Sequence, residues 1–308
     1  MRGPAEPRKN TALRGPDAHL GFPLVHGGGF GLYNRPIVPW SHAVPDLEKL
    51  ERLCAIARQV AEEEVMPRFL SVPTERKRDG SLFTEADLAT QMALARLLYD
   101  LAPYPMLGEE MSDEKHQQLW DENQSGLWVV DPIDGTTNFV HGLPHFAVSI
   151  SLMRCGRPMM GVVYLPVLNE CFYALAGYGA WMNGVRLPLV HGETQMAEAV
   201  AIVEPKWLSG RLPSRVTTVP PFGSLRNFGA STIDWCYLAA GRVDLMLHGA
   251  QKLWDYAAGA LIAEEAGCLY AALATDDYWR HNIWARSVVA ARTPTLFEAW
   301  KTWARANH

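Results

Sequence analysis

Apolar side chains recur at the three- and four-residue spacing of an amphipathic helix from Asp46 to about Val65. The same spacing returns over residues 86–101, so the pattern predicts two helices early in the chain. Continuous apolar runs then predict strands at 127–131, 146–153, 159–164 and 171–175. Turn residues at Cys155–Gly156 and around Asn169 separate the last three runs, which predicts an antiparallel meander.

The rest of the chain alternates between the two patterns. It predicts helices near 230–241, 255–266 and 294–306, and strands near 243–247 and 286–290. Helices and strands mixed in this way favour packing in layers. We therefore expect an α/β (α+β) sandwich in which helix layers alternate with sheet layers.

Residues 1–45 follow neither pattern and are rich in glycine and proline. Gly27–Gly29 is not a phosphate-binding loop, because no strand leads into it and no Gly-Lys-Ser/Thr follows. No apolar segment follows the basic start, so a secretory signal is not expected. We interpret 1–45 as a flexible N-terminal extension and 46–308 as a single catalytic domain.

Composition narrows the classes of partner. The 308 residues carry a formal net charge of −5, which gives no electrostatic footprint for nucleic acid or an acidic membrane. No apolar run approaches the ~20 residues that span a bilayer. The five cysteines are scattered, without a Cys-x-x-Cys pair. Free thiols in a reducing compartment are expected, which favours a cytoplasmic protein.

The run Trp128–Phe139 (Trp-Val-Val-Asp-Pro-Ile-Asp-Gly-Thr-Thr-Asn-Phe) carries the candidate chemistry. Asp131 and Asp134 follow a buried strand three residues apart, and two such carboxylates repel unless a hard cation lies between them. The Gly-Thr-Thr that follows offers backbone N–H groups and hydroxyls, which suit a phosphate. Metal and phosphate chemistry on one loop indicates phosphoryl hydrolysis.

This run resembles the signature of the inositol monophosphatase family, the magnesium-dependent, lithium-sensitive phosphatases, at every position. The resemblance extends over roughly residues 46–300. Its other blocks are Lys77–Asp87, Gly108–Glu110, Gly161–Tyr164, Gly179–Gly184 and Leu253–Gly259, in the family order. It implies the family's layered sandwich of two sheets and three helix layers.

The resemblance also implies a magnesium site. Glu109, Asp131 and the Ile133 carbonyl oxygen would hold a first Mg²⁺. Asp131 would bridge to a second ion, which Asp134 and Asp255 also bind. A third, weaker ion near Glu109 is also implied. Taken alone, Glu109 reads as a solvated loop acid, and Asp255 as the N-cap of the helix that it begins.

The remaining roles concern water and phosphate. The resemblance implies that Glu109 and Thr136 orient the attacking water, and that Asp87 accepts a hydrogen bond from the Thr136 hydroxyl. Backbone N–H groups of Gly135 and Thr136 would contact the phosphate at a helix start. Lys77 would add positive charge to the site, or would be an ordinary surface lysine in a basic run.

Two positions depart from the inositol-specific pattern. Members of that group carry a glutamate seven residues before the helix aspartate, where this chain has His248. A neutral histidine can accept one hydrogen bond but brings no negative charge, and nearby Lys252 makes the local field more positive. Ser231 stands where alanine is frequent and would add a hydroxyl contact to the substrate.

These features predict a phosphoric monoester hydrolase that needs two or three Mg²⁺ ions and acts on a small sugar or polyol phosphate resembling inositol 1-phosphate. The alternatives are a phosphatase of a bisphosphate (nucleotide 3′,5′-bisphosphate, fructose 1,6-bisphosphate or NADP) and a weakly active regulatory binding protein of the same fold. The expected partner is the small phosphate ester, without nucleic acid or membrane. Lithium sensitivity and a homodimer are implied by the family.

Overall fold

The computed structural model describes residues 43–71, 74–76, 82–280 and 282–308. Helix α1 spans Ala43–Val60, so it begins three residues before the expected boundary at 46. The proposed flexible extension otherwise lies outside the described residues, as does Lys77. The described residues belong to one compact unit.

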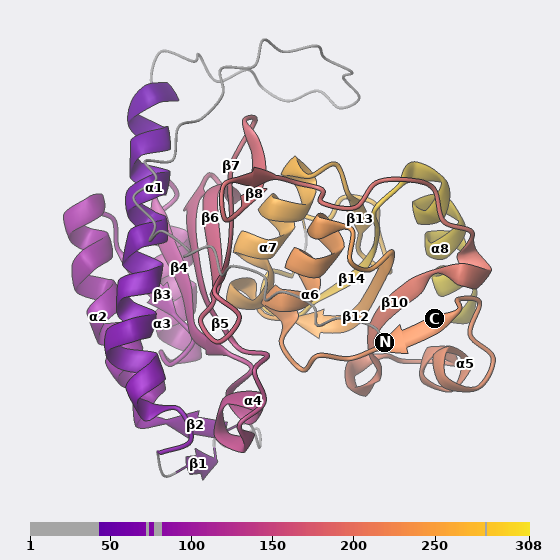
Figure 1. The fold of residues 1–308 in the computed structure, drawn as a ribbon, viewed down its shortest axis with the longest axis horizontal. Coiled ribbons are helices and arrows are strands. Elements are labelled where there is room, and N and C mark those ends of the chain that lie inside the picture. The colour runs from indigo at the N-terminus through magenta and orange to yellow at the C-terminus, as the bar shows by residue number, and fades with distance from the viewer. Residues whose placement is uncertain (1–42, 72–73, 77–81, 281) are drawn as a thin grey trace, which may run out of the picture. The chain divides into compact units, whose positions relative to one another are not determined.

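The first outer layer is made of helices α1 and α2 (Glu85–Leu101). A π-helical turn over Ala61–Val65 and a 3₁₀ turn over Met66–Arg68 continue α1. These helices pack on a seven-stranded sheet, α1 against β6 and β7 and α2 against β4 (Figure 1). The strand order of that sheet is β3 (Met106–Gly108), β4 (Leu127–Asp134), β5 (Ala147–Arg154), β6 (Arg157–Leu165), β7 (Glu170–Leu175), β8 (Gly179–Met182) and β9 (Val185–Arg186).

A second sheet of five strands lies beyond a middle pair of helices, α6 (Ser231–Ala240) and α7 (Leu253–Glu265). Its order is β11 (Ser224–Arg226), β10 (Val200–Glu204), β12 (Leu245–Gln251), β14 (Arg286–Ala291) and β13 (Leu269–Ala271). Helix α8 (Pro294–Asn307) covers the outer face of this sheet, with α5 (Leu212–Thr218) beside it.

The expected layering is therefore confirmed, since helices and sheets alternate across the unit (Figure 1). Both sheets are mixed: β3 pairs parallel to β4, and β10 pairs parallel to β11 and β12, while the other pairs are antiparallel. The predicted meander is formed by β5, β6 and β7. A separate two-stranded ribbon pairs β1 (Thr74–Arg76) with β2 (Leu82–Thr84).

Sequence periodicity missed the short elements. These are β1–β3, β8–β11 and β13, helices α3 (Asp113–Glu122), α4 (Thr136–His141) and α5, and 3₁₀ turns at Met196–Glu198 and Pro205–Trp207. Most of them span only two to seven residues, too few for a period of 2 or 3.6 to stand out. Helix α3 is polar along most of its length and buries only His116 and Leu119.

All five cysteines are free thiols, as expected, and four of them are buried. Within the described ranges, no helix combines the length and the apolar character that crossing a membrane would require.

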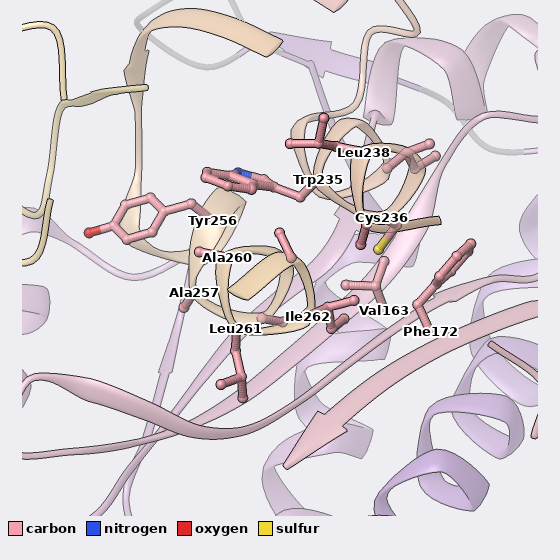
Figure 2. Packing of buried hydrophobic residues seen from close by; sticks show 14 of the residues in the cluster. Val163, Phe172, Trp235, Cys236, Leu238, Tyr256, Ala257, Ala260, Leu261 and Ile262 are labelled. Carbon is pink, nitrogen blue, oxygen red and sulfur yellow. The ribbon is translucent and has the colours of Figure 1, made fainter. Parts of the chain in front are cut away.

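Close contact between α6 and α7 sets the middle layer. Trp235 of α6 lies beside Tyr256 and Ala260 of α7 in a buried cluster that also takes in Val163 and Phe172 of the large sheet (Figure 2). Gly259 allows this approach, because a Cβ built there would lie 2.5 Å from Trp235 Cβ and 2.8 Å from its Cγ. The two helices begin at Ser231 and Leu253, so their packing fixes the positions of two candidate site segments.

The close contact between Gly259 and Trp235 predicts whether Gly259→Ala raises or lowers the free energy of unfolding. Glycine inside a helix normally costs about 0.5–1 kcal/mol relative to alanine, so Gly259→Ala should stabilise if propensity dominates. We expect a loss of about 1–3 kcal/mol instead, because the added methyl overpacks the α6–α7 contact. Chemical denaturation measures the free energy of unfolding directly. An increase in that free energy would show that the helices are not in this close contact.

Candidate active site

The candidate acids lie where several elements of the middle of the fold begin or end. Asp131 and Asp134 lie at the C-terminal end of β4. Glu109 directly follows β3, the parallel neighbour of β4. The Glu109 N–H donates to the Val130 carbonyl at 3.3 Å, which ties its backbone to β4 one residue before Asp131. Asp255 lies in the first turn of α7.

Electrostatics show that these carboxylates share one neighbourhood. Burial raises the pKa of Asp131 well above its usual range, and the carboxylates of Glu109, Asp134, Asp255 and Asp87 raise it further. Burial also raises the pKa of Asp255, with added repulsion from Asp134 and Glu109. The pKa of Asp134 rises to about 6 through burial, although hydrogen bonds from Thr232 oppose the change. Five acids from distant parts of the chain therefore lie within electrostatic reach of one another.

Local hydrogen bonds hold each aspartate in place. The Ile133 N–H donates to Asp131 Oδ1 at 3.1 Å, and the Lys252 N–H donates to Asp255 Oδ2 at 2.8 Å. The Thr232 N–H and hydroxyl donate to Asp134 Oδ2 at 2.7 and 2.6 Å. Among the described residues, no three His, Cys, Asp or Glu side chains are already arranged as a metal cage.

The donor set nevertheless suits a hard divalent cation. It consists of carboxylate oxygens, the ligands that Mg²⁺ prefers, and it carries a concentration of negative charge in a buried place. Lys252 opposes the rise in the pKa of Asp255, because its backbone hydrogen bond and its positive charge lower that pKa. Metal binding would remove the mutual repulsion and offset the cost of burying these charges.

The loop after Asp134 turns sharply into α4. Gly135 adopts a left-handed conformation with φ of 87°, and the His145 carbonyl oxygen lies 2.8 Å from where its Cβ would be, so a side chain is excluded there twice over. The turn brings the Thr136 hydroxyl back to the Ile133 carbonyl, to which it donates at 3.1 Å. The hydrogen bond from this hydroxyl to Asp87, which the family resemblance implies, stays a prediction.

Asp87 has a local role in addition to its place near Asp131. Its Oδ2 accepts hydrogen bonds from the Thr84 N–H at 2.8 Å and the Thr84 hydroxyl at 2.7 Å, in a capping box at the start of α2. This box places a buried carboxylate at the end of β2 facing the acids of β4.

His248 and Ser231 are placed differently from one another. Ser231 is the first residue of α6, and its backbone hydrogen bond lowers the pKa of Asp134. His248 is buried in β12, which lowers its pKa to about 4. Its Nδ1 accepts from the Ala250 N–H at 3.1 Å, so the neutral ring carries its proton on Nε2. The expectation that His248 would accept a bond from substrate is therefore replaced by a donor at Nε2.

Three side chains that sequence reasoning missed support the site. Thr232 anchors Asp134 as described above. Asn138 Nδ2 donates to the carbonyls of His145 and Phe228, both at 2.6 Å, which joins α4 to the loop before α6. The run Trp128–Phe139 contains Asn138 but does not indicate its partners, and Thr232 carries no signal in the sequence.

The third is His116 of α3. Its Nε2 lies 2.9 Å from the Gly108 carbonyl, and its ring lies 4.7 Å from that of Trp254. It therefore bridges the residues immediately before Glu109 and Asp255. The residues around His116 in the sequence do not predict this role.

The comparisons with known proteins bear on this arrangement. Nus factor SuhB of Escherichia coli (strain K12) is 33% identical over 236 residues, covering 74% of this chain and 84% of that protein. Inositol monophosphatase 2 of Solanum lycopersicum is 38% identical over 213 residues, covering 65% of this chain and 78% of that protein. The solved Thermotoga maritima IMPase has a TM-score of 0.72 and 26% identity, covering 84% of this chain and 97% of that one.

A model of the inositol monophosphatase family matches residues 45–305, which confirms the resemblance seen in the motifs. The match includes every candidate residue of the site and both sheets. The chain therefore belongs to the inositol monophosphatase family, a family of phosphomonoesterases.

Proposed function

We propose that the protein is a magnesium-dependent phosphomonoesterase that hydrolyses a small sugar or polyol phosphate similar to inositol 1-phosphate. The observation that carries the proposal is the group of acids Glu109, Asp131, Asp134 and Asp255 beside the Gly-Thr-Thr turn, of which Asp131 and Asp134 are buried. Such a concentration of like charge in a buried place is costly unless it binds cations. The family relationship supports Mg²⁺ as the cation.

In this proposal each residue keeps the role that its position allows. Glu109, Asp131 and the Ile133 carbonyl hold one ion, and Asp131, Asp134 and Asp255 hold another. The bound ions supply a water nucleophile and positive charge for the phosphate. The Thr136 hydroxyl donates to Ile133, which leaves its lone pairs to orient that water together with Glu109. The Ile133 carbonyl retains a second lone pair for the metal.

The remaining contacts complete the proposed site. Backbone N–H groups of Gly135 and Thr136 bind the phosphate, and Asp87 adds its negative charge to that of Asp131 for cation binding. Ser231 and His248 face the alcohol part of the substrate, and Lys77 adds charge to the phosphate side. Lithium inhibition, a homodimer and a cytoplasmic location belong to the proposal on the strength of the family relationship.

A second candidate function comes from the relatives named Nus factor SuhB. Their name raises a binding role for the same fold, with or without turnover. All five acids of the site are present here, which favours the enzyme. A binding role and hydrolysis are separable by experiment.

The direct test is magnesium-dependent phosphate release from a panel of inositol 1-phosphate, adenosine 3′,5′-bisphosphate, fructose 1,6-bisphosphate, NADP and histidinol phosphate. Asp134→Asn should lower kcat/KM by more than about 100-fold, since losing even a residue that supports a ligand costs 10–100-fold. Asp100→Asn, on the exposed last turn of α2, is the matched control and should match the wild type. Equal activity of Asp134→Asn and wild type would refute the metal assignment. Silence of the wild type on every substrate, with Mg²⁺ binding intact, would favour the binding-protein reading.

The electrostatics predict an unusual pH dependence of stability. The folded-state pKa of Asp134 is about 6, above the value of 3.8 for an unperturbed aspartate. A carboxyl group whose pKa is raised by folding stabilises the folded state below pH 4. This contribution to the free energy of unfolding is lost as the pH rises through 6. In the presence of a chelator the free energy of unfolding should therefore fall between pH 4 and pH 7, by on the order of 2–3 kcal/mol from Asp134 alone.

Added Mg²⁺ should remove this loss at pH 7, because the cation stabilises the ionised carboxylates. Asp134→Asn should flatten the profile measured with chelator. Thermal denaturation at each pH, with chelator or with Mg²⁺, measures both effects. A metal-free protein whose stability rises from pH 4 to pH 7 would contradict the buried, mutually repelling cluster.

A further inference from the structure

Strand alternation places an additional acid on the substrate side of the site. In β10 and β12, Ile202 and Met246 pack in the core shared with α6 and α7. Their neighbours pack instead in the core under α8, namely Ala201, Val203, Leu245 and Leu247. Because side chains alternate between the faces of a sheet, Glu204 and His248 lie on the α6–α7 face. The helices that pack on this face carry two parts of the site. Thr232 of α6 donates to Asp134, and Asp255 lies in the first turn of α7.

Glu204 is the direct neighbour of His248. The two residues are opposite each other in the parallel register of β10 and β12. The Glu204 carboxylate raises the pKa of His248, against the larger lowering by burial, so the two side chains interact. Residue 248 is a histidine where the inositol-specific pattern has a glutamate. In this chain a glutamate, Glu204, lies beside that position on the adjacent strand.

Two hydrogen bonds hold the Glu204 carboxylate in place. Its Oε1 accepts from the Lys206 N–H at 2.8 Å and its Oε2 from Asn227 Nδ2 at 3.0 Å. Asn227 Oδ1 in turn accepts from the Gly229 N–H at 2.9 Å, in the loop that Asn138 binds. The turn after Glu204 packs against Gly249, where a side chain would collide with the Trp207 carbonyl. These contacts fix the carboxylate without neutralising its charge.

A buried carboxylate connects Glu204 to the proposed metal site. Asp234 lies in the first turn of α6 and is only 4% exposed. Its Oδ1 is buried without a hydrogen-bond partner. Burial raises the pKa of Asp234 well above its usual range, and the carboxylates of Asp134 and Glu204 raise it further, so Asp234 lies within electrostatic reach of both. Acidic side chains as well as Lys252 therefore surround His248.

We propose that Glu204 is a specificity-determining residue, which with His248 Nε2–H binds adjacent hydroxyl groups of a polyol monophosphate and disfavours a second phosphate. This inference rests on the proposed function. A hydroxyl both donates and accepts, which matches an acceptor carboxylate next to a donor N–H. A second phosphate would match His248 but meet the charge of Glu204, and an ammonium group would match Glu204 but meet the His248 donor.

The test uses the full-length variant Glu204→Gln. This substitution keeps the shape of the side chain and an acceptor oxygen for the Lys206 N–H, but it removes the negative charge. Glu198→Gln, an exposed acid just before the other end of β10, is the matched control. Substrates are inositol 1-phosphate, fructose 1,6-bisphosphate and p-nitrophenyl phosphate, which has no hydroxyl groups. Glu204→Gln should lower kcat/KM for inositol 1-phosphate by about tenfold or more, mainly through KM. It should leave p-nitrophenyl phosphate within about twofold and raise kcat/KM for the bisphosphate.

An unchanged ranking of the three substrates in Glu204→Gln would overturn the assignment while leaving the phosphatase proposal intact. An equal loss on all three would also overturn it, because it would indicate a structural role. If the wild type hydrolyses none of them, the proposed function fails, and calorimetric binding decides the role of Glu204. Inositol 1-phosphate should then bind more weakly to Glu204→Gln than to wild type in Mg²⁺, with inorganic phosphate unchanged. Equal binding of inositol 1-phosphate would overturn the inference.

Discussion

The burial of several like-charged carboxylates at one place is the constraint on which the rest of the structure depends. Loss of water raises the pKa of Asp131, Asp134 and Asp255, and neighbouring carboxylates, among them that of Glu109, raise each of the three further. Repulsion of this kind pushes elements apart unless the surrounding packing holds them. The fold therefore has to supply that packing from outside the cluster.

It does so with two kinds of contact. Apolar packing of α7 against α6 and against the large sheet fixes the backbone at Asp255 (Figure 2). Polar contacts then set individual groups: Thr232 holds Asp134, and His116 joins Gly108 to Trp254 by a hydrogen bond and a ring contact. The backbone that carries the acids is thus held rigidly. The negative charge of the ionised carboxylates is balanced when cations bind. This combination is what a phosphatase that uses metal ions requires.

The same logic extends to the substrate side. His248 is neutral and presents a donor, while Glu204 restores an acceptor from the neighbouring strand. A change of residue type at one position is thus compensated across a sheet. Pocket charge has to be judged from the neighbours in space, because Lys252 and His248 alone suggest the opposite sign.

Sequence reasoning recovered the layered fold and the long elements, because long periodic segments carry a clear signal. It recovered the motif acids because Asp131 and Asp134 lie in one contiguous run. It did not recover the partners that hold them. Thr232 lies 98 residues from Asp134, and Glu204 meets His248 only through the strand register. Such contacts depend on tertiary packing, which a single sequence without its fold does not display. The position of the His248 proton could not be predicted for the same reason, since the Ala250 N–H reaches Nδ1 only in the folded bulge of β12.

The most direct measurement is diffraction from crystals of the full chain soaked in Mn²⁺, with anomalous differences locating the ion. Mn²⁺ stands in for Mg²⁺ because both prefer oxygen ligands in octahedral geometry. The account predicts anomalous peaks bound directly to Asp131 and Asp134, with Glu109 and Asp255 as further ligands. Peaks only at other sites, with these carboxylates unliganded at saturating Mn²⁺, would contradict it.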